Sequence, residues 1–173
     1  MGLHPAVAAV RRGVRRVLGP LEQGSTVLVA CSGGADSLAL LSATVFEARR
    51  PGHRVVGVTV DHGLQDGSAE HAARVVAQMA GLGADETATA RVQVDPGGLG
   101  VEAAARRARY EVLEQVREHF GAAVVLLGHT RDDQAETVLL GLARDDTVAA
   151  CLAEGIEAWD DPHNHDPGFA RVR

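Results

Sequence analysis

ACSGGADSLALL, Ala30 to Leu41, is the stretch that decides the fold. The run that leads into it, STVLVAC, is apolar, rich in β-branched residues and bounded by glycines, which is typical of a short buried strand. The residues that follow predict a helix over 36–49, with apolar side chains at helical spacing. In the turn between them, Gly33 and Gly34 let a ligand approach the backbone closely. Because the next helix points its free N–H groups at the turn, the pattern favours an anion such as phosphate or pyrophosphate.

The turn does not match the common phosphate-binding motifs. GxxxxGK[ST] requires a lysine, which this chain lacks, and GxGxxG has a different glycine spacing. SGGADS resembles instead the PP-loop, SGGxDS, of the ATP pyrophosphatases, which cleave ATP to AMP and pyrophosphate while adenylating a substrate oxygen. An ordinary glycine-rich turn is the alternative, and the complete match directly after a strand makes it the weaker interpretation.

Composition limits the class of protein. The 173 residues suit one domain with a sizeable core, and the formal net charge of −6 argues against a free-standing nucleic-acid binder. It does not argue against a catalytic domain whose nucleic-acid contacts are local or lie on another domain. Cys31 and Cys151 form no CxxC pair, which indicates a reducing, cytoplasmic setting. We find no signal peptide and no apolar run long enough to cross a membrane, and expect no membrane partner.

Predicted strands alternate with predicted helices along the chain. Uniformly apolar strands of this kind predict an α/β fold, a doubly wound parallel five-stranded sheet with helices on both faces. The strands are expected at 25–31, 54–60, 87–94, 123–127 and 156–159, and the helices at 5–18, 36–49, 68–82, 101–120, 131–144 and 147–154.

Polar clusters follow three of these strands. SGGADS follows the first, Asp61 and His62 follow the second, and GHTRDDQAET follows the fourth. In doubly wound sheets ligands bind beyond the carboxyl ends of the strands, where the strand order reverses, so we expect the three clusters at one edge.

The fourth-strand cluster carries the most chemistry. Asp132, Asp133 and Glu136 share one face of the first helical turns, beside His129. Carboxylates there complement the helix dipole, but three of them beside a histidine suit Mg²⁺ ligation or the orientation of an amine. His129 is either a general base or a hydrogen-bonding wall.

Five motifs together resemble the catalytic domain of the bacterial tRNA(Ile)-lysidine synthetases. They are SGGADS, VDHGL, AR-x-x-RY, GHTRDDQAET and DDPHNHDPGFAR. The resemblance implies an enzyme that uses ATP and Mg²⁺ to adenylate the 2-carbonyl oxygen of the wobble cytidine in tRNA(Ile). The side-chain amine of free L-lysine then displaces AMP and gives lysidine. The partners would be tRNA(Ile) and L-lysine, and a homodimer is the assembly to test.

The same resemblance implies roles for individual residues. Asp36 would be the Mg²⁺ partner as well as a catalytic residue, and Arg171 would neutralise charge developing on the phosphates. The ATP phosphates would be held by Ser32, Gly33, Gly34, Ala35, Asp36 and Ser37. The lysine and cytidine pocket would be lined by His129, Asp132, Asp133 and Glu136. Further substrate contacts would come from Asp61, His62, Arg106, Arg109, Tyr110, Asn164 and Asp166. Taken alone, the long helix could equally present a surface pair and a core aromatic.

The chain departs from the family pattern in two places. The family continues into C-terminal domains that help to select the tRNA, so we expect 1–173 to be the catalytic domain without that region. The family also has a Gly/Ser-rich loop and a strand after the GHxxDDQAET helix. Because no glycine or proline lies between Leu142 and the next predicted helix to end the first one, we predict that residues are missing near 142–147.

Two other functions stay open on sequence grounds. A PP-loop cytidine thiolase would need cysteines to carry sulfur or an iron–sulfur cluster, which two distant cysteines fit poorly. A non-catalytic nucleotide-binding module would need the phosphate loop but not the carboxylate–histidine cluster.

Overall fold

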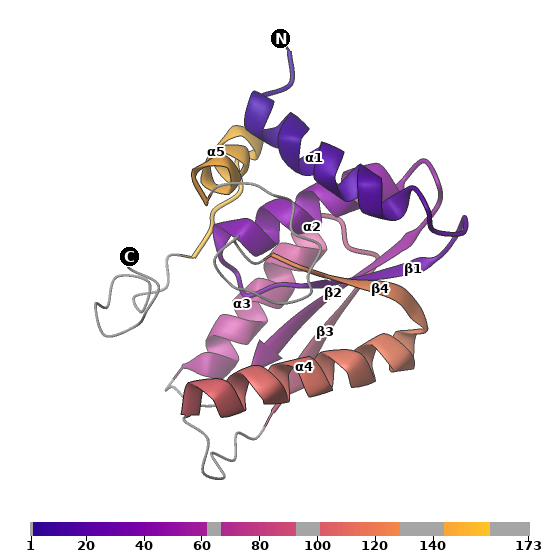
Figure 1. Ribbon diagram of the computed structural model, residues 1–173. Helices are drawn as coiled ribbons and strands as arrows, with labels where there is room; N and C mark the ends of the chain where they lie inside the picture. The colour runs from indigo at the N-terminus through magenta and orange to yellow at the C-terminus, as the bar shows by residue number, and fades with distance from the viewer. Residues whose placement is uncertain (1, 62–66, 93–100, 129–143, 160–173) are drawn as a thin grey trace.

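The computed structural model describes residues 2–61, 67–92, 101–128 and 144–159 (Figure 1). In these ranges strands and helices alternate, as the sequence predicts. The elements are α1 (Pro5–Leu18), β1 (Thr26–Ala30), α2 (Ala35–Ala48), β2 (Arg54–Asp61), α3 (Ser68–Gly81), β3 (Glu86–Arg91), α4 (Val101–Phe120), β4 (Ala122–Leu127) and α5 (Arg144–Glu154).

The strands form one parallel sheet in the order β3-β2-β1-β4. The chain runs outward from β1 through β2 to β3, then returns to place β4 on the other side of β1. The strand order therefore reverses between β1 and β4, and their carboxyl ends mark the expected ligand-binding edge.

The predicted fold class is confirmed, but the prediction of a fifth strand is wrong for the described residues, which hold four strands. Residues 156–159 do not join the sheet. Their backbone groups bond elsewhere, since the Trp159 amide donates to the Gly33 carbonyl at 2.8 Å and Gln78 Nε2 donates to the Glu157 carbonyl at 2.7 Å. A segment held by these bonds lies against α3 and the loop after β1 instead of forming a ladder.

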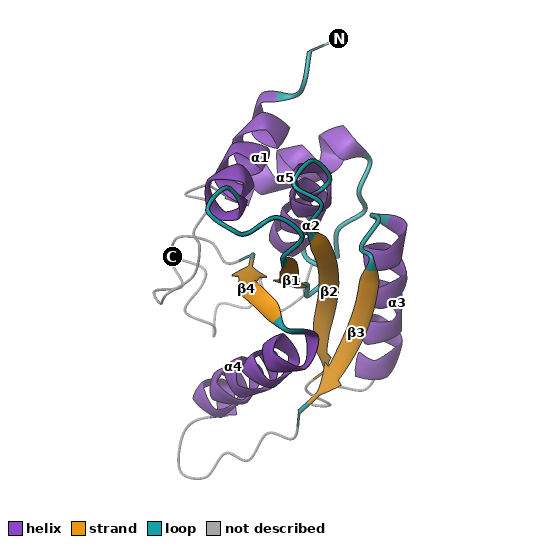
Figure 2. Ribbon diagram, turned by 90° about the vertical axis from the view of Figure 1, so that its right-hand side faces the viewer, coloured by secondary structure: helices purple, strands orange, loops and turns teal. Residues whose placement is uncertain are grey.

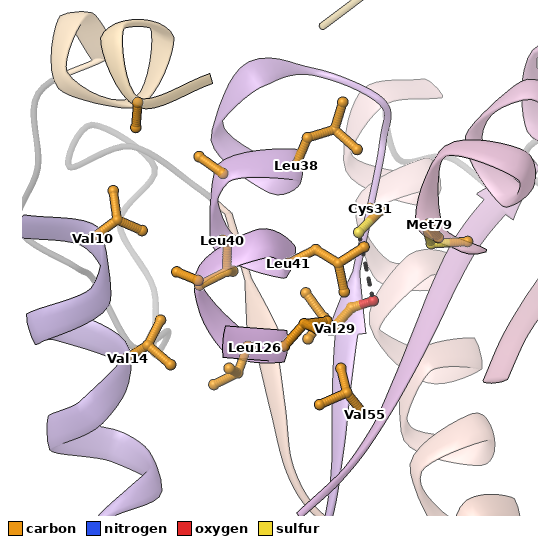
Figure 3. Packing of buried hydrophobic residues seen from close by; sticks show 14 of the residues in the cluster. Val10, Val14, Val29, Cys31, Leu38, Leu40, Leu41, Val55, Met79 and Leu126 are labelled. Atoms are coloured by element: carbon orange, nitrogen blue, oxygen red, sulfur yellow. Dashed lines mark hydrogen bonds between the residues drawn. The ribbon is translucent and has the colours of Figure 1, made fainter. Parts of the chain in front are cut away.

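Helices cover both faces of the sheet (Figures 1 and 2). Alternate residues of β1 point to opposite faces, so Leu28 packs on the α4 side whereas Val27 and Val29 pack on the side of α2 and α3. Helices α1 and α5 lie outside α2 and extend the larger core (Figure 3). The buried residues of the α4 side are Leu28, Val56, Val58, Ala90, Leu113 and Ala122.

Helix α1 forms where the sequence predicts it. Pro5 opens it, and its buried stripe includes Val7, Val10 and Val14. On its polar side Arg11 forms an ion pair with Glu154 at 2.6 Å, which ties α1 to α5. None of the helices that the structure describes is both long and apolar enough to cross a bilayer.

Candidate phosphate-binding site

The glycine loop, residues 32–37, connects the end of β1 to the first turn of α2. Gly33 has a φ of +88°, a backbone conformation that residues other than glycine rarely adopt. A Cβ at this position would lie 2.9 Å from Val75 Cγ2. Gly34 is the N-cap of α2 and has no side chain to bond the first amides of the helix. These amides and the positive end of the helix dipole therefore suit a bound anion.

Two serines hold the glycine loop in shape. The Ser37 hydroxyl donates to the Gly34 carbonyl at 2.9 Å and accepts from the Ser32 amide at 3.2 Å. Ser32 Oγ lies 3.4 Å from Ser37 Oγ. Because Ser37 is buried and bonds within the loop, its hydroxyl shapes the loop from inside.

Asp36 lies in the first turn of α2, where Thr147 of α5 donates a hydrogen bond to its carboxylate. One helical turn further along α5, Cys151 Sγ donates to the Ala35 carbonyl at 3.2 Å. Helix α5 is therefore hydrogen-bonded to the residues that would bind the phosphates and the metal.

The residues at this position could bind Mg²⁺ only together with the phosphates of a bound nucleotide. Among the described residues no group of three or more His, Cys, Asp or Glu side chains could hold a metal. Mg²⁺ in nucleotide enzymes is commonly bound by one or two carboxylates together with substrate phosphates. Asp36 beside the amides of the glycine loop meets that requirement.

The end of β4 lies directly against the glycine loop. A Cβ built on Gly128 would come within 2.7 Å of the Ser37 backbone nitrogen and 2.8 Å of the Asp36 carbonyl carbon. The expected meeting of the first and fourth strand ends is thus confirmed.

The remaining predicted site residues are placed only in part. Asp61 ends β2, is buried, and lies 3.5 Å from Arg91 Nε. Arg109 and Tyr110 are half-buried on α4, which covers the sheet face opposite α2. Arg106 also belongs to α4, but its side chain is outside the described part of the structure. Wholly outside it are His62, His129, Asp132, Asp133, Glu136, Asn164, Asp166 and Arg171.

A PP-loop domain family model matches residues 7–171 of the chain. The chain belongs to the PP-loop family. The glycine loop is its PP-loop.

Curated relatives share close to half of the residues. The tRNA(Ile)-lysidine synthase of Salinispora arenicola is 49% identical over 203 residues, covering 99% of this chain and 60% of the relative. Those of Thermobifida fusca and Streptomyces coelicolor are 50% and 44% identical, over 99% and 100% of this chain and 61% and 64% of the relatives. The chain thus spans less than two thirds of the length of these relatives.

Two solved structures share the fold. The U34-tRNA thiolase NcsA from Methanococcus maripaludis, with its [4Fe-4S] cluster, superposes with a TM-score of 0.77 at 14% identity, covering 95% of this chain and 68% of that one. An NAD+ synthetase from Burkholderia pseudomallei gives a TM-score of 0.64 at 21% identity, covering 90% and 69%. At such low identities the likeness concerns the fold alone.

The two cysteines border the PP-loop but are poorly suited to thiolate chemistry. Burial raises the pKa of Cys31 to about 12 and is the main cause that raises the pKa of Cys151 to about 11. Both thiols are therefore protonated at neutral pH, whereas nucleophilic and metal-binding cysteines act as thiolates.

Sequence reasoning missed several residues that touch the PP-loop. Thr147 and Cys151 reach it across more than a hundred positions of sequence, and no local pattern signals such a pairing. His71 lies within an ordinary amphipathic helix, and its Nε2 is 2.9 Å from the Ser32 carbonyl. Trp159 is the single tryptophan of the chain, and its rarity is the one feature in the sequence that could have drawn attention to these residues.

Proposed function

We propose that the chain is the catalytic domain of a tRNA(Ile)-lysidine synthetase. It would use ATP to ligate L-lysine to the wobble cytidine of tRNA(Ile), forming lysidine and releasing AMP and pyrophosphate. The observation that carries this proposal is the PP-loop at the reversal of the strand order, in a chain 44–50% identical to relatives named tRNA(Ile)-lysidine synthase.

The reaction has two displacements. The 2-carbonyl oxygen of the cytidine forms a bond to the α-phosphorus of ATP, and pyrophosphate leaves. The neutral side-chain amine of lysine then attacks the activated C2, and AMP leaves with the electrons of the C–O bond. The leaving group of the first step is an anion, which the backbone amides of Gly33 and Gly34 and the N-terminus of α2 would stabilise.

Asp36 is proposed as the metal partner and as a catalytic residue. Mg²⁺ held there with the phosphates would neutralise the negative charge that grows on the departing pyrophosphate. The Thr147 hydroxyl, which donates to the same carboxylate, limits the orientations that the side chain can take.

The substrate contacts are carried forward as proposals. The lysine side chain and the cytidine are assigned to His129 and the acidic residues after it, where a group able to accept a proton would keep the attacking amine neutral. The residues of the closing motif are assigned to the charge on the phosphates. The proposed set is Asp61, His62, Arg106, Arg109, Tyr110, His129, Asp132, Asp133, Glu136, Asn164, Asp166 and Arg171. We further propose that the protein acts in the cytoplasm. A homodimer is the proposed assembly, which the mass of the protein in solution would test.

A sulfur-transfer function is not favoured. The chain has two cysteines, and both are buried with raised pKa values. A thiolase that carries sulfur on cysteine would require an accessible thiolate.

The deciding experiment measures AMP release from ATP. We expect release only when L-lysine and unmodified tRNA(Ile) are both present, and none with the same tRNA whose wobble cytidine is replaced by uridine. A chain that binds ATP but exchanges no isotope between pyrophosphate and ATP in the presence of tRNA would instead be a non-catalytic nucleotide-binding module.

A further inference from the structure

Three successive carbonyl groups of the PP-loop each accept a hydrogen bond, two of them from outside the loop and one from Ser37 within it. His71 Nε2 on α3 lies 2.9 Å from the Ser32 oxygen. The Trp159 amide donates to the Gly33 oxygen at 2.8 Å, and the Ser37 hydroxyl donates to the Gly34 oxygen at 2.9 Å. Since a carbonyl oxygen can only accept, His71 must carry a proton on Nε2 in this arrangement.

Holding a carbonyl also orients the amide that follows it. In a trans peptide the C=O and the next N–H lie in one plane and point in opposite directions, and no peptide bond of the described chain is cis. The bond to His71 therefore turns the Gly33 N–H away from α3. The bond to Trp159 likewise turns the Gly34 N–H away from residues 156–159, and this N–H donates a long hydrogen bond to Ser32 Oγ at 3.4 Å.

His71 and Trp159 also support one another. Their rings lie 4.2 Å apart between centroids, at an angle of 46°. Gln78, two turns along α3 from His71, bonds the Glu157 carbonyl and keeps the same segment on the helix. Helix α3 and residues 156–159 thus hold the PP-loop together, through the bonds of His71 and Trp159 to two of its carbonyl groups. We call this pair of bonds the carbonyl clamp.

We propose that His71 and Trp159 are positioning residues that hold the amides of the PP-loop ready for the pyrophosphate part of ATP. This inference rests on the proposed function, because it gives the loop the anion that the function requires. Neither residue needs to touch the nucleotide. Their contribution is that the peptide planes of the loop do not have to turn when the anion binds, so that only the long bond from the Gly34 amide to Ser32 Oγ has to be exchanged.

Two substitutions separate the hydrogen bond from the ring contact. His71→Phe keeps a ring beside Trp159 but removes the donor, whereas His71→Gln keeps a donor at a similar reach but removes the ring. We expect His71→Phe to raise the Kd for pyrophosphate and for ATP·Mg²⁺ about fivefold or more, the loss expected for one hydrogen bond, and His71→Gln to restore most of it. Should the Phe variant fail to fold, His71→Ala replaces it, since it removes the donor without adding bulk.

Gln78→Leu is the matched control. It removes a bond to the same segment without touching the PP-loop, so affinity should stay within about twofold of the wild type if the carbonyl clamp is what matters. Binding is measured by calorimetry, and thermal unfolding of each variant reports whether its fold is intact. As the only tryptophan, Trp159 also reports the loop directly, and its emission should change when pyrophosphate binds.

The possible outcomes distinguish a failure of this inference from a failure of the proposed function. A wild-type chain that binds neither pyrophosphate nor ATP overturns the proposed function. A wild type that binds both, with folded His71→Phe or His71→Ala equally tight, overturns the clamp alone. Equal weakening by His71→Phe and Gln78→Leu would show that attachment of the segment, and not the Ser32 bond, governs affinity, and would also overturn it.

Discussion

Adjacent glycines in the PP-loop are required for different physical reasons. At Gly33 the positive φ and the nearby Val75 side chain exclude any larger residue. At Gly34 the φ of −74° is ordinary, and a Cβ would meet Ser32 Oγ at 3.5 Å and the Trp159 oxygen at 3.9 Å, both normal contacts. The contacts at Gly34 leave room for a Cβ, so under the proposed function the requirement for glycine there comes from the bound phosphates.

Gly34→Val should therefore abolish ATP binding while leaving the fold intact, because the branched side chain occupies the space above the amides. Calorimetric titration with ATP tests the loss of binding, and thermal unfolding tests whether the fold is intact. Gly81→Val, at the end of α3 where nothing lies within 4 Å of the built Cβ, is the matched control. Unchanged affinity in the Gly34 variant would place the nucleotide elsewhere.

Asp36 should matter more for turnover than for nucleotide affinity. Asp36→Asn keeps an acceptor for Thr147 but removes the negative charge, and we expect turnover to fall by about two orders of magnitude or more. Steady-state AMP release and ATP affinity, measured on the same preparation, separate the two effects. A loss below about tenfold would make Asp36 a structural residue.

Cys31 should make the fold sensitive to alkali. Its pKa rises from 9.0 to about 12 on burial, so between these values the unfolded chain has lost the thiol proton and the folded chain keeps it. The unfolded state then binds fewer protons, and stability falls as pH rises, by up to about 1.4 kcal/mol per pH unit. Urea unfolding from pH 8 to 11 should show a shallower decline for Cys31→Ala, and parallel curves would contradict the assignment.

Contacts between elements build the site from three directions. Helix α3 reaches the PP-loop through His71 and Val75, and α5 reaches it through Thr147 and Cys151. The end of β4 packs against it at Gly128, where an added Cβ would lie 2.7 Å from the Ser37 nitrogen. The loop is therefore shaped by elements that are distant from it in sequence.

Gly128→Ala should destabilise the protein by about 1–3 kcal/mol, the usual cost of an overpacked site. The added methyl would lie 2.7 Å from the Ser37 nitrogen, and backbone in the first turn of a helix cannot move aside as a flexible side chain can. Denaturant unfolding measures the loss. Gly81→Ala, in an open position, should be neutral or stabilising, and a Gly128 variant as stable as that control would mean that β4 shifts freely.

Over the whole molecule, the chain is shorter than its relatives across the matched region. The alignment with the Salinispora arenicola protein runs over 203 residues whereas the chain has 173, so the relative has residues there that this chain lacks. Of the predicted gap near 142–147, residues 144–147 form the continuous first turn of α5, which begins earlier than the predicted helix 147–154, so no residues are missing there. Residues 142 and 143 lie outside the described part of the structure. Where the additional residues fall stays a prediction.

That prediction can be tested by mass spectrometry on the protein from its natural source. Cleavage after glutamate should release TVLLGLARDDTVAACLAE, residues 137–154, if the chain is continuous there. We expect this peptide to be absent, and the peptides that begin at Thr137 or end at Glu154 to carry residues that are not in this sequence. Detection of the shorter peptide at its calculated mass would contradict the gap.

The sequence by itself determined the local structure and the nature of the loop. Apolar runs and helical spacing placed the strands and helices because burial needs those periods, and helices α1 and α4 begin and end at the predicted residues. SGGADS predicted a PP-loop because its spacing and its place after a strand are local properties, and the family match confirms that prediction.

Only the tertiary structure decided how these parts meet. Alternating strands and helices are compatible with many strand orders, and the order β3-β2-β1-β4 follows from how the faces pack. Residues 156–159 looked apolar enough for a strand, yet their hydrogen bonds go to Gly33 and Gln78. Thr147 meets Asp36 across 111 positions, and His71 meets Ser32 across 39. Such contacts depend on the path of the chain through space, which no pattern of neighbouring residues encodes.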